Sequence, residues 1–145
     1  MTEDVFHLGI QAIIQNKQGR VLLLKVNPSV MHKFIGKPYW DIPGGRITKG
    51  STVEATLKRE VEEETGISKI VSFKPFSMVL SNIRIPIRDY DVGLILASYI
   101  CAVDNYSQVK LSSEHTEAKW FTPKEASKLL EFKYPKEFTN KLLDL

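Results

Sequence analysis

Residues 44–67, GGRITKGSTVEATLKREVEEETGI, carry the strongest structural signal in this sequence. The glycine pair predicts a tight turn, and the run that follows has the periodicity of an amphipathic helix. Its apolar residues on one face are Val53, Leu57 and Val61. We expect a helix over residues 52–65 that stops at Gly66, because glycine readily adopts the left-handed conformation that follows many helices.

Three glutamates gather on one side of this helix. Glu60, Glu63 and Glu64 are three or four residues apart, so their carboxylates meet near the helix C-terminus, where the helix dipole disfavours negative charge. By helical phase Glu60 and Glu64 point with the apolar face towards the protein body, which is costly without a positive partner. A Mg²⁺ ion, which prefers oxygen ligands, would compensate this charge. An ordinary solvated acidic face is the alternative.

The same residues resemble the signature of the Nudix (MutT-like) hydrolase family. That signature is Gly, five residues, Glu, seven residues, then Arg-Glu-apolar-any-Glu-Glu-any-Gly-apolar. Here Gly45 opens it and residues 59–67 complete it. The resemblance implies an α/β fold, the Nudix-type α/β/α sandwich with a mixed β-sheet and a loop–helix–loop catalytic motif. It also implies that residues 1–145 form a single Nudix hydrolase domain.

The resemblance further implies a metal site and an activity. The metal ligands would be the Gly45 carbonyl oxygen and the carboxylates of Glu60, Glu63 and Glu64, with Arg59 orienting Glu60. The cofactor would be Mg²⁺ or Mn²⁺. The reaction would be hydrolysis of a phosphoanhydride in a nucleoside diphosphate linked to another group, above all a nucleoside triphosphate. Hydrolases of nucleotide sugars, ADP-ribose or dinucleoside polyphosphates, and a nucleotide-binding regulator without catalysis, are the alternatives.

One position departs from the family pattern, since Ser51 stands where the first glutamate of the signature is expected. In the family, that residue braces the loop and the arginine, here Arg59, more than it binds metal. Ser51 with Glu54 could instead form a capping box at the helix start, and Thr52 is the competing cap. The departure therefore bears on how Arg59 is held.

The general base has a weaker signal. Residues 112–117, SSEHTE, precede an expected strand and are similar to the late region in which many Nudix members carry a further glutamate. Glu114 is the first candidate, as a catalytic base or as an additional metal ligand, and His115 and Glu117 are weaker ones. A solvated loop without a catalytic role is the alternative.

Substrate-binding residues are suggested mainly by side-chain chemistry. Tyr39, Trp40 and Phe34 could stack on a nucleobase, although aromatic residues beside strands often pack in the core. Arg46 directly follows the glycines and could meet a phosphate, with plain surface exposure as the alternative. Further cations that could form a basic rim are Lys74, Arg84 and Arg88.

Composition sets broader limits. The chain has 145 residues, of which 43% are hydrophobic, and its net charge of +3 is too small to indicate nucleic-acid binding. Its one cysteine, Cys101, excludes an internal disulfide and is expected in the core. No apolar run approaches the roughly 20 residues of a membrane span. We therefore expect a cytoplasmic protein. The family resemblance implies a small nucleotide as its partner, and we expect a monomer or homodimer.

The remaining sequence alternates between strand and helix patterns. Residues 6–15 and 21–26 are apolar and flank the turn-forming residues 16–19, which predicts a β-hairpin. Residues 27–38 are expected to form a loop. Further strands are expected over residues 39–42, 70–85, 92–103 and 118–121. Helices are expected after the capping sequence of residues 122–125, as far as about residue 132, and from residue 136 to the C-terminus.

Overall fold

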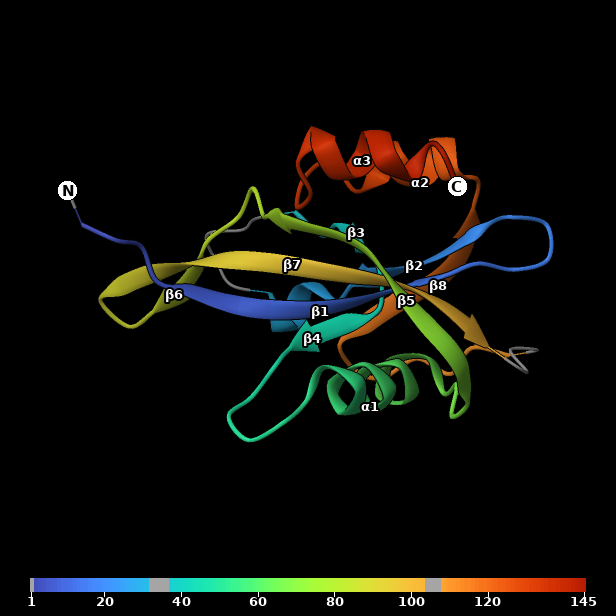
Figure 1. Cartoon of the computed structure of the whole chain (residues 1–145), viewed down its shortest axis with the longest axis horizontal. Helices are drawn as coiled ribbons and strands as arrows, with labels where there is room; N and C mark the ends of the chain where they lie inside the picture. Colours follow the sequence, from blue (N-terminus) through green and yellow to red (C-terminus); the bar gives the residue numbers. More distant parts are fainter. Residues whose placement is uncertain (1, 32–36, 104–107) are drawn as a thin grey trace.

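Two β-sheets form the middle of the molecule, with helices on both sides (Figure 1). The structure is a computed structural model that describes residues 2–31, 37–103 and 108–145. The helices are α1 (Val53–Thr65), α2 (Pro123–Leu129), α3 (Lys136–Leu142) and the short 3-10 helix η1 (Pro28–Val30). Figure 1 shows α1 on one side of the sheets and α2 and α3 on the other. This arrangement confirms the predicted α/β/α sandwich. No helix within the described ranges is long and apolar enough to cross a membrane.

The larger sheet is mixed, as predicted. Its strand order is β4-β1-β7-β5, with β6 paired to β7. Only β1 and β7 run parallel among these pairs. Its strands are β1 (Phe6–Ile14), β4 (Gly44–Arg46), β5 (Ile70–Leu80), β6 (Ile85–Ile87) and β7 (Tyr90–Val103). A second, antiparallel sheet has the order β3-β2-β8 and consists of β2 (Val21–Val26), β3 (Trp40–Asp41) and β8 (His115–Phe121).

The predicted hairpin between β1 and β2 is wrong. The chain turns as expected, but the two strands meet at an isolated bridge between Gln15 and Val21 and then enter different sheets. In the described structure β1 is flanked by β4 and β7, which leaves no edge for β2. Both strands are buried on both faces, and the neighbours Ile13 and Ile14 pack into different core clusters. One cluster lies under α2 and α3 and the other under α1.

The strand predicted over residues 70–85 is interrupted. It ends at Leu80, because the Ser81 hydroxyl donates to the Lys133 carbonyl at 2.7 Å and the Asn82 amide donates to the Glu131 and Tyr134 carbonyls at 3.0 and 3.1 Å. These bonds tie the chain to the loop between α2 and α3. The same loop begins earlier than predicted, since α2 ends at Leu129.

The helix α1 matches its predicted bounds, but its cap does not match the capping box of Ser51 and Glu54. Thr52 is the N-cap, and its hydroxyl accepts a hydrogen bond from the Ala55 amide at 3.1 Å. Ser51 instead lies 3.1 Å from the Thr56 hydroxyl. At the other end Gly66 has φ of 78°, the left-handed conformation expected there.

Cys101 is buried in the core cluster beneath α1, as predicted. Burial raises the pKa of its thiol to about 12, so it stays protonated at neutral pH. The residue is therefore part of the packing and not a nucleophile.

Candidate active site

The carboxylate of Glu64 is buried between α1 and the strand β4. Its residue is 4% exposed, and Oε1 accepts a hydrogen bond from the Gly44 amide at 2.7 Å. Burial raises the pKa of Glu64 to about 9, although the bond from Gly44 acts in the opposite direction. Negative charge on Glu60, Asp41 and Glu114 raises this pKa further. The neighbouring carboxylates therefore repel a negative charge on Glu64, and nearby cations among the described residues do not compensate this repulsion.

This raised pKa gives a stability prediction for the metal-free protein. The folded state keeps a proton on Glu64 up to about pH 9, whereas the unfolded chain releases it above 4.5. Stability should therefore fall as pH rises through this window, by up to about 1.4 kcal/mol per pH unit. Glu64→Gln should flatten that fall and be more stable than wild type at pH 8. Urea unfolding at pH 5 and pH 8 with a chelator measures this, and parallel pH profiles would contradict it.

Glu60 lies one helical turn away, against the backbone of Gly45. Its side chain is 15% exposed, and Arg59 Nη2 donates to its Oε1 at 3.1 Å. Burial raises the pKa of Glu60, opposed by the Arg59 hydrogen bond and reinforced by the charges of Glu63 and Glu114. A Cβ at Gly45 would lie 2.4–2.8 Å from the Glu60 carboxylate. Any larger residue at position 45 would therefore displace the Glu60 carboxylate.

The two glycines do not form the predicted turn. They belong to β4, where Gly45 pairs with Ile10 and Gly44 with Gln11, and neither has a positive φ. Glycine is required here because another part of the chain approaches the backbone closely: a Cβ at Gly44 would lie 2.3 Å from the carbonyl oxygen of Ile10. The backbone of β4 is thereby clamped between β1 and the glutamates of α1.

Arg59 and Glu63 lie at the outer side of this cluster. Glu63 has a side chain that is 60% exposed, and its Oε1 is 3.9 Å from Arg59 Nε. Such an exposed pair contributes little to stability. Arg59 is held by Glu60 and Glu63 of its own helix. The Ser51 hydroxyl lies against Thr56 instead, so Ser51 does not replace the missing signature glutamate as a partner of Arg59.

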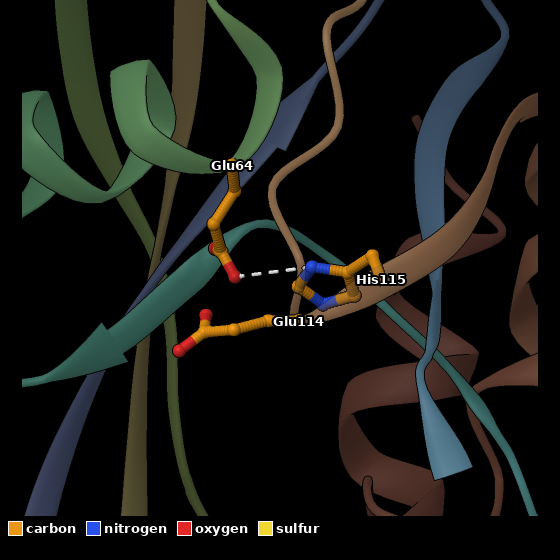
Figure 2. A group of neighbouring side chains, drawn as sticks. All are labelled: Glu64, Glu114 and His115. Carbon is orange, nitrogen blue, oxygen red and sulfur yellow. Dashed lines mark ion pairs between the residues drawn. The ribbon is translucent and has the colours of Figure 1, made fainter. Parts of the chain in front are cut away.

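The loop that leads into β8 brings a third carboxylate and an imidazole to the same place. Figure 2 shows Glu114 and His115 pointing towards Glu64, and their ligand atoms all lie within 4.8 Å of one another. The end of β2 positions this loop, since the Asn27 amide donates to the Glu114 carbonyl and its side chain to the Ser113 carbonyl, both at 2.8 Å. Glu114 thus joins the α1 glutamates.

The two weaker candidates of that loop differ in position. His115 has a side chain that is 7% exposed, with Nδ1 3.5 Å from Glu64 Oε2. Burial lowers the pKa of His115, against the raising effect of Asp41 and Glu114, so the ring is neutral at physiological pH. Glu117 is exposed and lies 3.5 Å from Lys25, away from this cluster.

A hollow of about 690 Å³ lies between β1, β4 and α1, beside the carboxylate cluster. The candidate residues that line it are Gly45, Arg46, Arg59, Glu60 and Glu114. Carboxylates and cations therefore share one surface large enough for the polyphosphate of a nucleotide.

Comparison with known proteins identifies the architecture. The sequence model of the NUDIX domain matches residues 5–142. The chain belongs to the Nudix family. It is 36% identical over 66 residues to a Bacillus subtilis (strain 168) protein provisionally named 8-oxo-dGTP diphosphatase, a match covering 46% of this chain. That match spans only 39% of the relative's length.

Solved structures support the same Nudix fold. The MutT protein of Methanosarcina mazei Go1 has a TM-score of 0.69 and 25% identity, with 98% of this chain and 94% of that chain covered. An Ap4A hydrolase of C. elegans has a TM-score of 0.63 and 21% identity, with 95% and 92% covered. The second likeness shows the fold alone.

A smaller hollow of about 200 Å³ adjoins the first in this Nudix domain. Both are lined by Gly44, Gly45 and Arg46. The smaller one is also lined by Tyr39 and Lys133 and is otherwise mainly apolar. Its volume suits one planar ring system, and Arg46 lies between it and the larger hollow.

A buried network behind this hollow could not be read from the sequence. Lys133 Nζ donates to Asp41 Oδ2 at 2.5 Å, and the Tyr134 hydroxyl donates to Asp41 Oδ1 at 2.7 Å. Burial alone would lower the pKa of Lys133, but Asp41 and Tyr39 raise it above its usual value, so the ammonium stays charged. These partners are 92 and 93 residues apart, and no local pattern links them.

The aromatic candidates are separated by the fold. Tyr39 lines the small hollow and packs on Phe132 with ring centroids 5.0 Å apart. Trp40 packs edge-on against Phe121 at 5.0 Å and does not line either hollow, which favours a packing role. Phe34 lies outside the described residues.

The cationic candidates are also dispersed. Arg46 is exposed beside the hollows, with Nη1 3.1 Å from His7 Nδ1. Arg84 is paired with Asp4 and Asp91 and lines neither hollow. Lys74 lies on β5, also away from the residues that line the two hollows.

Proposed function

We propose that this protein is a Mg²⁺-dependent pyrophosphohydrolase of a nucleoside diphosphate linked to another group, with nucleoside triphosphates as the favoured substrates. The observation that carries the proposal is the meeting of Glu60, Glu64 and Glu114, from two distant parts of the chain, beside the bare backbone of Gly45. The Bacillus relative, named for a nucleoside triphosphate, supports this class, and dinucleoside polyphosphates are the alternative.

The residues present fit a hard divalent cation. Glu64 and Glu60 are carboxylates whose burial raises their pKa values, and the Glu60 carboxylate lies directly against the backbone of Gly45. Glu64, Glu60, Glu114 and Gly45 would hold the cation, with Glu63 nearer the solvent. When bound, Mg²⁺ neutralises phosphate oxygens and acidifies water. Mn²⁺ could serve in its place.

The chain's own side chains provide the rest of the chemistry. Arg46 and Arg59 line the larger hollow, where guanidinium groups would bind and orient the phosphates. Glu114 is exposed at that hollow, so a carboxylate oxygen that does not bind the cation would accept the proton of the attacking water. Arg59 also holds the Glu60 carboxylate through the hydrogen bond to Oε1.

The smaller hollow would receive the nucleobase, with the Tyr39 ring as its aromatic wall. Tyr39→Leu should raise KM about 10-fold and change kcat less than threefold, because base stacking contributes about 1–3 kcal/mol to binding. Steady-state kinetics on the best substrate measures both constants. Tyr90→Leu, an exposed tyrosine outside this hollow, is the matched control and should leave KM unchanged. Equal kinetics for the two variants would contradict this placement.

The function itself is tested by product release from a substrate panel with and without Mg²⁺. The panel holds NTPs, dNTPs and their oxidised forms, dinucleoside polyphosphates, ADP-ribose and nucleotide sugars. We expect a nucleoside monophosphate and pyrophosphate from at least one triphosphate. Folded, metal-binding protein that binds nucleotides but turns over none of the panel would overturn the hydrolase proposal and favour a binding protein.

A further inference from the structure

The imidazole of His115 faces the carboxylates of the site without being bonded to them. Its side chain is 7% exposed, and Nδ1 lies 3.5 Å from Glu64 Oε2 (Figure 2). Within the described ranges, this nitrogen is a buried side-chain atom that has no hydrogen-bond partner. A buried polar atom without a partner costs free energy and calls for a physical explanation. A ligand bound to this nitrogen would supply one.

We propose that His115 supplies a nitrogen ligand, through Nδ1, to a divalent cation that it holds together with Glu64 and Glu114. The three ligand atoms lie within 4.8 Å of one another. Two ligand atoms that each bind one cation at about 2.0–2.2 Å are at most about 4.4 Å apart. The 3.5 Å between Nδ1 and Oε2 falls within that limit. The inference deepens the proposed function and rests on it, because the same cation would serve hydrolysis.

The backbone holds His115 in this orientation independently of any ligand. The residue begins β8, where it pairs with Val26 at the end of β2, and its amide faces the Ser112 carbonyl. The preceding Glu114 is tied to Asn27 by a backbone hydrogen bond of 2.8 Å. A ligand presented by a paired strand is preorganised, which lowers the cost of binding.

An imidazole changes which cation the site prefers. Mg²⁺ binds oxygen almost exclusively, whereas Zn²⁺ accepts imidazole nitrogen readily and Mn²⁺ accepts it more readily than Mg²⁺ does. Wild type should therefore prefer Mn²⁺ to Mg²⁺ more strongly than a variant without the imidazole. Even mutating a residue that only orients a ligand weakens metal binding about 10–100-fold, so we expect loss of the imidazole to weaken Mn²⁺ binding at least about 10-fold and to leave Mg²⁺ binding unchanged.

The test is pulsed electron paramagnetic resonance of Mn²⁺ bound to the intact protein, which detects nitrogen nuclei coupled to the ion. The chain has three histidines, His7, His32 and His115. Wild type should show a nitrogen coupling that changes when histidine alone is labelled with ¹⁵N. His115→Gln should abolish the coupling, because an amide binds cations through oxygen, and should weaken Mn²⁺ binding about 10-fold.

His7→Ala is the matched control, since His7 lines the larger hollow but faces Arg46. It should keep the nitrogen coupling. If His115→Gln fails to fold, retention of the coupling in both His7→Ala and His32→Ala still assigns it to His115. Bound Mn²⁺ without nitrogen coupling in wild type, or coupling that persists in folded His115→Gln, would overturn the inference.

The same data separate this inference from the proposed function. Substrate turnover by wild type with a cation bound by oxygen alone refutes the histidine ligand and leaves the hydrolase intact. Nitrogen coupling in a protein that turns over no substrate supports the histidine ligand and refutes the hydrolase.

Discussion

Glu64→Gln should lower Mg²⁺-dependent turnover at least about 1,000-fold while the protein stays folded. Metal-assisted stabilisation of charge contributes several kcal/mol to such reactions, and about 4 kcal/mol corresponds to this factor. The fold should persist because the glutamine oxygen can still accept the Gly44 hydrogen bond of 2.7 Å. Removing a buried carboxylate also removes the repulsion that Glu60 and Glu114 exert on it.

The control for this variant is Glu62→Gln on the same helix. Glu62 is exposed and points away from the cluster. The Glu62→Gln variant therefore removes one carboxylate from the same helix without changing the site. Its kcat should remain within about twofold of wild type. Equal losses in both variants would show that overall charge, and not the buried carboxylate, supports turnover.

Gly45→Ala and Gly44→Ala should fail for different reasons. The three atoms nearest to the added Cβ of Gly45→Ala all belong to the Glu60 carboxylate, which can rotate away, so we expect turnover to fall about 100-fold with little change in stability. The Cβ of Gly44→Ala meets the backbone of Ile10 at 2.3 Å, which cannot move without breaking the β1–β4 pairing. That variant should lose more than about 3 kcal/mol of stability or not fold.

Gly50→Ala is the control for both glycine variants. Gly50 has φ of 85° with open space around it, so alanine there should cost about 1 kcal/mol from backbone strain and leave kcat unchanged. Thermal melts and steady-state kinetics on the three variants separate stability from activity. Full activity in Gly45→Ala would mean that Glu60 does not need its present position.

The sequence reveals the local part of this site because local physics determines it. Helical phase alone places Glu64 on the buried face and Glu62 on the exposed one, and Gly66 ends the helix as expected. Ser51 and Thr52 are adjacent and can cap the helix by the same hydroxyl chemistry, so no sequence pattern distinguishes which of them is the N-cap. The structure shows Thr52.

Long-range pairing accounts for what the sequence does not reveal. The division of β1 and β2 between two sheets depends on β7 and β8, which lie far along the chain. The carbonyls of the loop between α2 and α3 attract Ser81 and Asn82, and this interrupts a strand that looks continuous in the sequence. The convergence of Glu114 on Glu64 likewise needs the β2–β8 pairing, so the family resemblance suggested it and no local pattern in the sequence did.

The central claim is that Glu64 of α1 and Glu114 of the β8 loop act on one metal-dependent centre. A double-mutant cycle of kcat tests it most directly, with Glu64→Gln, Glu114→Gln and the combined variant assayed at saturating Mg²⁺ on the best panel substrate. Residues that act as a unit are strongly non-additive, so the double variant should be little worse than the poorer single variant. Losses that multiply, as they do for independent sites, would contradict the account.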